Sequence, residues 1–325
     1  LRQTRFRPFR RWEDNYRENM KSFLSQREVR CPRSLLKQAA RAEPVTTAII
    51  GAGHSLVLES AREAQQAGII QPLLVGDAKA IGEAAKEIGW DIEDLQIVEA
   101  ASEERSAKEG AVLARSGAVQ MVMKGHIHSD TFMRPLLAKD TGIRGKQRLS
   151  HVFHMTLPDT DEAIMLTDCA VNVAPNIPTR LAIIENAVAL AHKLGQQRPR
   201  VALLGASETV SDAMPVTGQC QEITAHFGAT NLQADVFGPL AFDNIVSVAA
   251  SRMKGIEHTV AGNADIVVVP TIEAGNALFK MMVYFMSACA GGIVLGGSVP
   301  VLLTSRADPP AARLASAALG AIAGR

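Results

Sequence analysis

The sequence predicts an α/β fold made of two three-layer α/β/α domains with mostly parallel sheets. Short runs rich in Val, Ile and Leu alternate with longer segments of helical periodicity over most of the 325 residues. Hydrophobic residues make up 47% of the chain and aromatic residues only 4%. Small aliphatic side chains must therefore build the core, as they do where helices pack on a parallel sheet.

The first half of the chain shows the alternation in order. Four short apolar runs predict strands at 45–50, 70–75, 95–98 and 119–124. The segments between them have apolar residues at helical spacing, which predicts helices at 56–67, 78–88 and 103–116. Strands separated by helices are expected to lie parallel.

The second half departs from this rhythm once. Only a turn-rich stretch, 158–161, separates the predicted strands 151–155 and 163–167, so we expect an antiparallel pair. The remaining predicted elements are a helix at 179–194, strands at 200–204, 264–269 and 299–304, and a helix at 311–322.

These elements suggest three parts of the chain. Residues 1–43 are predicted to be a basic N-terminal extension or linker. Residues 44–148 together with 294–325 form a first, discontinuous α/β domain, and residues 149–293 form a second.

Charge is concentrated at the N-terminus although the net charge is only +1. Residues 1–42 carry twelve Lys or Arg and four Asp or Glu. A basic segment can contact nucleic acid or acidic lipid, but we interpret this one as a solvated helix or linker and expect neither partner. The chain begins at Leu1, so we expect a processed form or part of a longer protein.

The uncharged stretch 281–305 is long enough to cross a membrane. Four glycines and Pro300 interrupt it, which predicts a helix end, a turn and a buried strand, and no membrane span. The four cysteines are scattered without CxxC spacing. They predict reduced thiols in a cytoplasmic protein.

Several common motifs are absent or incomplete. The run 51–56 begins like a dinucleotide fingerprint but has Leu56 at the third glycine position. There is no GxxxxGK[ST] loop for a nucleoside triphosphate and no GxSxG nucleophile elbow. The histidine pairs at 126/128 and 151/154 lack acidic or Cys partners at metal spacing, so we interpret them as core or surface residues and predict no metal.

The pair Ser305-Arg306 follows the apolar run 299–304. A hydroxyl and a guanidinium at the end of a buried strand are costly to leave unpaired. Arginine presents a planar set of donors that matches phosphate, and Arg134 from a distant segment offers a second. These residues predict an anion site, the alternative being two surface arginines in ordinary salt bridges.

Four loops rich in Gly, Ser, Thr, Asn and Arg follow predicted strands, at 125–134, 205–212, 270–276 and 304–308. Such loops line ligand clefts at the carboxyl ends of strands, where we expect them to gather. Gly275 and Asn276 are expected to open a helix and offer backbone N–H groups to an anion. Capping and turn formation are the alternative for each loop alone.

The loops resemble those of the phosphate acetyltransferase/phosphate butyryltransferase family. The similar pieces are Met123-Lys-Gly125, Thr131-Phe-Met-Arg134-Pro, Gly142-Ile-Arg144-Gly, Leu149-Ser-His151, Met165-Leu-Thr-Asp168, 207–215, 270–276 and 303–308, in the same order. The Met-Lys-Gly and Thr-Ser-Arg-Ala-Asp forms look closer to the butyryl branch. The portion from about Arg30 also resembles the transferase half of longer hydratase–transferase proteins.

The resemblance implies the isocitrate/isopropylmalate dehydrogenase-like fold and a cytoplasmic homodimer. It implies an acyltransferase that interconverts short-chain acyl-CoA plus phosphate and acyl phosphate plus CoA. Transfer is expected to be direct, in a ternary complex in the interdomain cleft. Coenzyme A is then a substrate, and no cofactor or metal is bound.

The resemblance also implies roles for individual residues. The expected catalytic residues are Ser305, Arg306 and Asp308. The phosphate or acyl phosphate is expected at Arg134, Ser129, Thr131, Lys124 and Arg144, and CoA at Ser207, Thr209, Ser211, Glu273, Gly275 and Asn276.

One position departs from the family pattern. Acetyl-type members have an acidic residue six positions after the arginine of the Ser-Arg pair, where this chain has Ala312. Asp308 is the substitute candidate for the base that deprotonates the CoA thiol, or else a helix N-cap. A CoA-binding or docking domain without catalysis is the alternative function, and a dehydrogenase of similar fold is a third.

Overall fold

The computed structural model describes residues 24–140, 142–145, 147–304 and 308–325. The strands are β1 (Val45–Ile50), β2 (Ile70–Gly76), β3 (Ile97–Glu99), β4 (Met121–Lys124), β5 (Ser150–Thr156), β6 (Ala163–Thr167), β7 (Arg200–Leu204), β8 (Asp235–Leu240), β9 (Ile266–Val268), β10 (Cys289–Leu295) and β11 (Val301–Leu302). The helices are α2 (Arg33–Ala39), α3 (Ser55–Gln66), α4 (Ala78–Glu87), α5 (Glu103–Ser116), α6 (Ser129–Leu136), α7 (Ile177–Lys193), α8 (Pro215–Gly228), α9 (Phe242–Val246), α10 (Val248–Met253), α11 (Ile272–Met286) and α12 (Pro310–Ala323).

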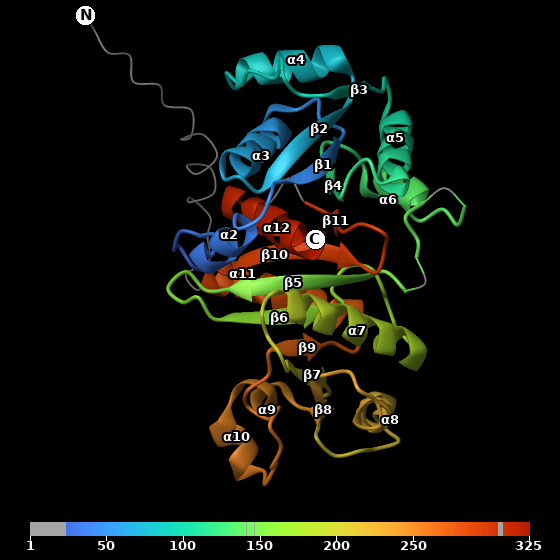
Figure 1. Cartoon of the computed structure of the whole chain (residues 1–325). Helices are drawn as coiled ribbons and strands as arrows, with labels where there is room; N and C mark the ends of the chain where they lie inside the picture. The colour runs from blue at the N-terminus through green and yellow to red at the C-terminus, as the bar shows by residue number, and fades with distance from the viewer. Residues whose placement is uncertain (1–23, 141, 146, 305–307) are drawn as a thin grey trace, which may run out of the picture.

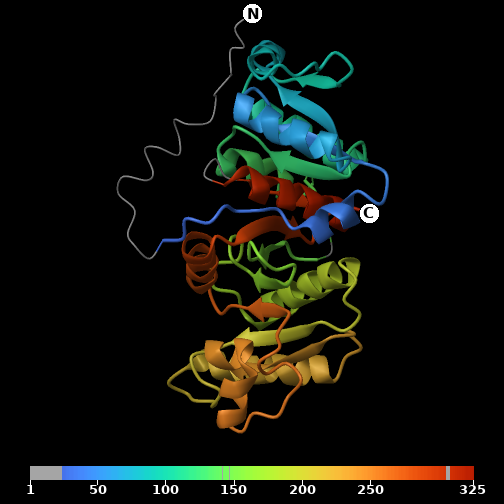
Figure 2. The same cartoon turned by 90° about the vertical axis from the view of Figure 1, so that its left-hand side faces the viewer.

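The described strands form one continuous 11-stranded sheet in the order β3-β2-β1-β4-β11-β10-β5-β6-β9-β7-β8. Most neighbours are parallel, and the antiparallel pairs are β11–β10, β10–β5 and β5–β6 in the middle. Helices cover both faces (Figure 1). The α/β class with a mostly parallel sheet is therefore confirmed. The strands of both expected domains share this sheet (Figure 2), and the domain boundaries stay a prediction.

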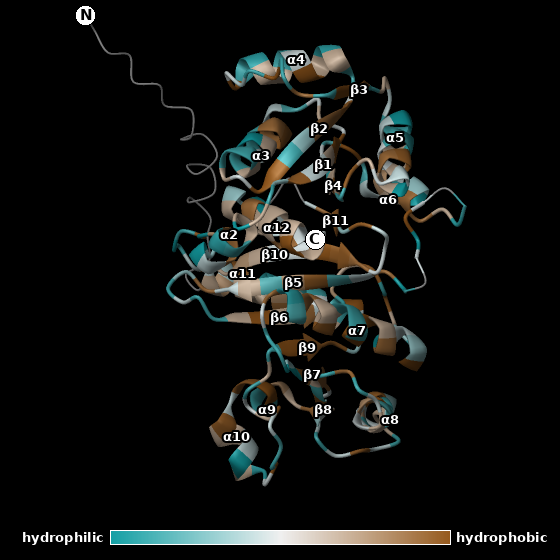
Figure 3. Cartoon of the chain, in the orientation of Figure 1, coloured by the Kyte–Doolittle hydropathy of each residue, from teal (hydrophilic) through white to brown (hydrophobic). Residues whose placement is uncertain are grey.

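The core lies on both faces of the sheet because consecutive residues of a strand point to opposite sides. In β1, Ile49 packs in the cluster formed with α3 and α12, whereas Ile50 packs in the cluster formed with α5 and α6. Both are fully buried. Figure 3 shows the corresponding pattern, with apolar strands inside and polar residues on the outer helix faces. Continuous apolar runs in the sequence follow from burial on two sides.

Local sequence sets the helix ends. The Asp77 carboxylate accepts a hydrogen bond from Ala80 N at the start of α4, and the Ser102 hydroxyl accepts one from Arg105 N at the start of α5. Gly117 ends α5 with a φ of 77°, in the left-handed region that glycine adopts at little cost. These caps explain why α4 and α5 lie within one residue of their predicted bounds.

The predicted antiparallel pair 151–155 and 163–167 is confirmed as β5 and β6. The stretch 281–305 contains the end of α11, then β10 and β11. The turn expected at the glycines is wrong for Gly291 and Gly292, which lie inside β10. Besides β10, the described elements that were not predicted are α2, α6, α8, β8, α9 and α10. Among the described residues, no helix combines the length and apolarity needed to cross a bilayer.

Candidate functional site

Three strands end side by side where the candidate site lies. β1 pairs with β4, and β4 pairs with β11, all in parallel, so their carboxyl ends share one edge of the sheet. The Thr304 hydroxyl donates a 2.8 Å hydrogen bond to the backbone oxygen of Lys124. This bond joins the chain after β11 to the end of β4. Two segments 180 residues apart therefore meet at this edge. The sequence predicted such a meeting for the loops at 125–134 and 304–308.

Glycine is needed at this edge because the backbones approach closely. A Cβ on Gly125 would lie 2.5 Å from the backbone oxygen of Gly51. Gly51 itself has a φ of 76°, in the left-handed region. These glycines let the turns after β1 and β4 pack against each other.

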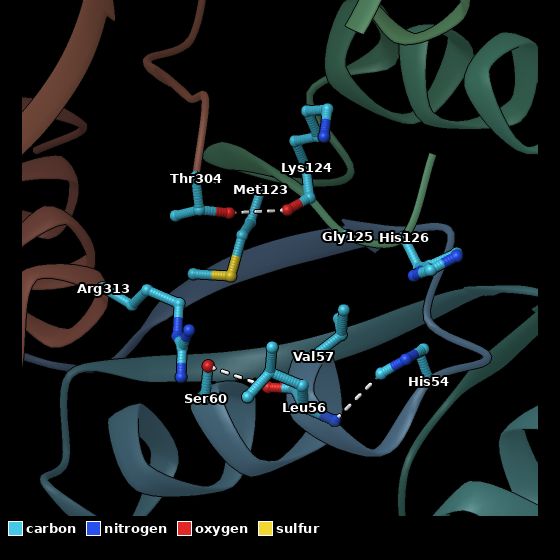
Figure 4. Close-up of a pocket in the computed structure, with 10 residues that line it drawn as sticks. All are labelled: His54, Leu56, Val57, Ser60, Met123, Lys124, Gly125, His126, Thr304 and Arg313. Carbon is cyan, nitrogen blue, oxygen red and sulfur yellow. Dashed lines mark hydrogen bonds between the residues drawn. The ribbon is translucent and has the colours of Figure 1, made fainter. Parts of the chain in front are cut away.

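A small recess lies at this edge, which we call the edge recess (Figure 4). Its volume is about 40 Å³. The residues that line it come from the N-cap and first turns of α3, the end of β4 and the two residues that follow it, the second residue after β11, and α12: His54, Leu56, Val57, Ser60, Met123, Lys124, Gly125, His126, Thr304 and Arg313. The recess therefore adjoins the strand ends that the sequence singled out.

Two histidines flank the edge recess. The rings of His54 and His126 are stacked, with centroids 4.6 Å apart and an interplanar angle of 6°. His54 Nδ1 accepts a 3.2 Å hydrogen bond from Leu56 N, so the proton of the neutral ring is on Nε2. The sequence indicates only a core or surface histidine at position 126. His126 is half-buried at the recess, a placement that no spacing pattern indicates.

Arg313 is a buried cation that sequence reasoning missed. Arg313 is 8% exposed, and its Nη1 donates a 2.7 Å hydrogen bond to the backbone oxygen of Asp308. Burial lowers the pKa of the Arg313 guanidinium, while the nearby carboxylates of Asp308, Glu63 and Glu59 oppose that shift. Its Nε is buried without a hydrogen-bond partner among the described residues.

The start of α12 settles one alternative for Asp308. The helix begins at Pro310, and its N-cap is Pro309, which makes no side-chain cap hydrogen bond. The reading of Asp308 as the N-cap is therefore wrong. Ala312 is buried on the same helix at 5% exposure.

The expected phosphate residues lie on two segments. Ser129, Thr131 and Arg134 belong to α6 and not to a loop, which corrects the loop expected over 125–134. The Arg134 side chain is exposed and has no hydrogen bond or ion pair with the described residues. Arg144 is exposed and forms an isolated backbone bridge with Gly297. Ser305 and Arg306 lie outside the described residues.

The expected CoA residues after β7 are used in local turns. Ser207 Oγ accepts from Thr209 N, and Ser211 Oγ accepts from Ala213 N. Such bonds fix the backbone of the loop and still leave the hydroxyl protons to donate.

Gly275 and Asn276 do not open a helix. The helix α11 begins at Ile272 with Thr271 as N-cap, and Gly275 N already donates to Thr271 O at 3.3 Å. The expected anion site on the Gly275 N–H is therefore wrong. A Cβ on Gly275 would lie 2.7 Å from Cys169 Sγ, so close packing explains this glycine. Glu273 lies in the first turn of α11, and its hydrogen bonds with Thr271 and its own backbone lower its pKa.

The four candidate loops do not share one edge of the sheet. Three successive antiparallel pairings lie between β11 and β6, so β6, β9 and β7 run antiparallel to β1, β4 and β11. The loops after β4 and β11 lie at one edge, and the loops after β7 and β9 lie at the other. The expectation that all four gather at one carboxyl edge is wrong, because the antiparallel strands reverse the sheet's direction.

Comparisons with known proteins agree on one family. Residues 105–321 match the family described as phosphate acetyl/butaryl transferase. The chain is 39% identical to the phosphate acetyltransferase of Rhizobium meliloti, over 87% of this chain and 90% of that protein. It is 36% identical to the phosphate butyryltransferase of Clostridium beijerinckii, over 89% of this chain and 96% of that protein.

Solved structures give the same picture. The branched-chain phosphotransacylase from Enterococcus faecalis V583 superposes with a TM-score of 0.75 and 32% identity, covering 86% of this chain and 99% of that one. A 4-hydroxythreonine-4-phosphate dehydrogenase from Burkholderia phymatum has a TM-score of 0.53 at 15% identity over 87% of this chain and 98% of that one, a likeness of fold alone. The expected dehydrogenase-like fold is confirmed to that extent.

Proposed function

Since the chain belongs to the phosphate acetyl/butyryl transferase family, we propose that it interconverts short-chain acyl-CoA plus phosphate and acyl phosphate plus CoA. The observation that carries the proposal is the junction of Thr304 with Lys124 at the shared edge of β4 and β11. Ser305 and Arg306 directly follow Thr304 in the sequence. The residues expected to act on the phosphate and on the acyl carbonyl thus follow, in the sequence, a residue that is hydrogen-bonded to the end of β4.

The reaction needs cations that bind the phosphate, a hydrogen-bond donor to the acyl carbonyl oxygen, and a group that exchanges the proton of the CoA thiol. A phosphate oxygen attacks the thioester carbonyl carbon, the C–S bond breaks, and the CoA sulfur leaves and takes up a proton. Arg306, Arg134 and Lys124 neutralise the phosphate, with the arginines able to bind two oxygens each. Ser305 donates a hydrogen bond to the carbonyl oxygen, which becomes negative during transfer.

Asp308 is proposed to exchange the thiol proton in place of the acidic residue that Ala312 replaces. Its position two residues after Arg306 and beside the Arg313 guanidinium supports this role. Holding both substrates together supplies much of the rate enhancement, and no covalent enzyme intermediate is needed. Intersecting initial-rate patterns for phosphate and acyl-CoA are expected, whereas parallel lines would contradict direct transfer.

We further propose that Arg144, Ser129 and Thr131 contact the phosphate. We propose that Ser207, Thr209, Ser211, Glu273 and Asn276, which follow β7 and β9 at the opposite edge of the sheet, contact the end of the elongated CoA molecule remote from its thiol. Gly275 is left out because its N–H is occupied. A homodimer is supported by the exposed apolar side chains of α11: Met281 is 53% exposed, Tyr284 45% and Met286 43%. Four unpaired cysteines in the described chain support a reducing, cytoplasmic location.

The alternative is a CoA-binding domain that has lost catalysis, and Ala312 favours it. Phosphorus NMR separates the two functions. A new acyl phosphate resonance should grow when the protein is mixed with butyryl-CoA and phosphate. CoA binding measured by calorimetry, without any acyl phosphate, would support the alternative.

A further inference from the structure

We propose that Arg148 binds a phosphate group of coenzyme A, and that the buried residues Asp168 and Asn172 hold its side chain in place for that contact. This inference rests on the proposed function and adds a residue to its CoA site. It depends on a chain of hydrogen bonds, on the exposed guanidinium at the end of that chain, and on its place in the fold.

The chain of hydrogen bonds begins at the carboxylate of Asp168, a residue that is 2% exposed. Its Oδ1 accepts from the backbone N–H groups of Ala170 and Val171. Its Oδ2 accepts from the backbone N–H groups of His151 and Asn172 and from Asn172 Nδ2. An ionised carboxylate offers about four lone-pair sites, so these donors satisfy it and it needs no direct contact with a cation.

Asn172 links this carboxylate to Arg148. Asn172 is 7% exposed, and its Nδ2 donates to Asp168 Oδ2 at 2.7 Å and to the backbone oxygen of Leu149 at 2.9 Å. These two bonds fix the orientation of the amide, and its Oδ1 accepts a 2.9 Å hydrogen bond from Arg148 Nε. Asn186 Nδ2 donates to the backbone oxygen of Arg148 at 2.8 Å. Buried groups therefore hold both the backbone and the side chain of Arg148.

The guanidinium of Arg148 has donors left for a ligand. Arg148 is exposed, and it forms no ion pair with the described residues. The bond to Asn172 engages Nε and leaves both Nη groups, the pair of donors that can bind two oxygens of one phosphate. Because a long side chain usually loses rotamer freedom on binding, an arginine that is already held binds an anion at a lower entropic cost.

Arg148 lies at the edge of the sheet where we place the remote end of CoA. It precedes β5 and Asn172 follows β6, and these antiparallel strands start and end at that edge. The Val173 backbone oxygen accepts a 2.9 Å hydrogen bond from Ile272 N, which joins the segment after β6 to the first turn of α11. Glu273, one of the proposed CoA residues, is in that turn.

Charge supports the assignment. CoA carries a diphosphate and a 3′-phosphate at the end remote from its thiol, and such groups are bound by cations. The side chains that we propose for this end, Ser207, Thr209, Ser211, Glu273 and Asn276, include no cation. Arg148 supplies a positive charge at the same edge.

The first test is the affinity for CoA, measured by calorimetry. Arg148→Gln should raise the Kd for CoA about 10- to 100-fold, the range for loss of a hydrogen bond between charged groups. Arg115→Gln, at the exposed end of α5, is the matched control and should keep the wild-type Kd. Dephospho-CoA, which lacks the 3′-phosphate, locates the contact. An equal Kd for dephospho-CoA in Arg148→Gln and wild type supports a contact with the 3′-phosphate, and a similar rise supports a contact with the diphosphate.

The second test asks whether Asn172 acts through Arg148. Asn172→Ala should raise the Kd for CoA about threefold to tenfold, because Arg148 must then be ordered on binding. The same substitution made in Arg148→Gln should have no further effect on the Kd. A rise of equal size in both backgrounds would show that Asn172 supports the fold and does not position Arg148.

The outcomes separate the inference from the function beneath it. CoA binding that weakens in Arg148→Gln, without any acyl phosphate formed by the wild type, would remove the proposed function and keep the CoA contact. An active wild type and an unchanged Kd for CoA in Arg148→Gln would overturn the contact alone. A raised KM for inorganic phosphate with an unchanged Kd for CoA would also overturn it and would assign Arg148 to the phosphate substrate. A wild type that does not bind CoA would overturn both.

Discussion

The Thr304 hydroxyl lies 2.8 Å from the Lys124 backbone oxygen and donates to it, tying the ends of β11 and β4 together. The bond fixes Thr304 relative to the strand that carries Lys124. The proposed reaction depends on Lys124 and on residues that follow Thr304 in the sequence.

Removing that hydroxyl should reduce activity more than stability. Thr304→Val keeps the shape of the side chain and is expected to cost about 1 kcal/mol of unfolding free energy. We expect kcat/KM for phosphate to fall about tenfold, as a misplaced group commonly causes. Thr304→Ser should retain the bond and the activity. Equal kinetics for the Val variant and wild type would show that the contact does not position the site.

Arg306→Ala should lower kcat/KM for phosphate about 100- to 1,000-fold, because it removes a charged donor from the transition state. Arg115→Ala, at the exposed end of α5, is the control and should behave as wild type. Steady-state kinetics at saturating acyl-CoA provide the measurement. Wild-type kcat/KM in Arg306→Ala would take Arg306 out of the site.

Asp308→Asn should change the pH dependence of the reaction between acyl phosphate and CoA. With a carboxylate base, the rate should vary little from about pH 6 to 8. Without it, the thiolate must come from solvent, and the rate should rise about tenfold per pH unit up to the thiol pKa near about 8.5. The two profiles are compared over that range. Superimposable profiles would leave Asp308 without a proton-transfer role.

His154 should make the protein less stable in mild acid. Burial lowers the pKa of His154 from 6.5 to about 4. Between those values the unfolded chain takes up a proton that the folded chain does not, so stability falls as pH falls below 6.5. Between about pH 7 and pH 5, the protonation of His154 in the unfolded chain should lower the free energy of unfolding by about 2 kcal/mol.

Urea unfolding at both pH values tests the assignment. The loss of stability between about pH 7 and 5 should be smaller by about that amount in His154→Gln. The exposed His226→Gln is the control. An unchanged difference in His154→Gln would show that His154 does not cause the acid sensitivity.

Gly275 should resist substitution for reasons of packing. Gly275→Ala places a Cβ 2.7 Å from Cys169 Sγ and 2.9 Å from Val269 Cγ2, and should cost about 1–3 kcal/mol. Gly218 lies inside α8, where an added Cβ would meet no described atom within 4 Å beyond its own helix, so Gly218→Ala should stabilise by about 0.5–1 kcal/mol. Denaturant midpoints of the two variants should move in opposite directions. A stabilised Gly275→Ala would contradict the close packing.

The sequence predicted the elements whose signals are local. Runs such as 45–50 and 163–167 are short, apolar and bounded by polar turns, and they became β1 and β6 unchanged. The helix α8 was missed because it begins at Pro215, directly after the turn-rich stretch 205–214. A proline that follows such a stretch is also typical of a loop. The edge strand β8 contains Gly238 and Pro239, residues that usually argue against a strand.

The candidate site was predictable only in part. The sequence predicted that the loops after β4 and β11 lie at the same edge of the sheet, and the parallel pairing of these strands confirms it. The direction of β6, β7 and β9 was not predicted, because three antiparallel pairings depend on how the whole sheet assembles. Arg313 was overlooked because an arginine in an alanine-rich helix shows its burial only after α12 packs. The His54–His126 stack likewise joins residues with no sequence pattern in common.

The most direct test of the central claim is release of free CoA thiol from acetyl-, propionyl- and butyryl-CoA with and without phosphate. We predict release that requires phosphate and occurs with all three substrates. No release from any of them, although CoA still binds, would contradict the proposed acyl transfer and identify a binding domain without catalysis.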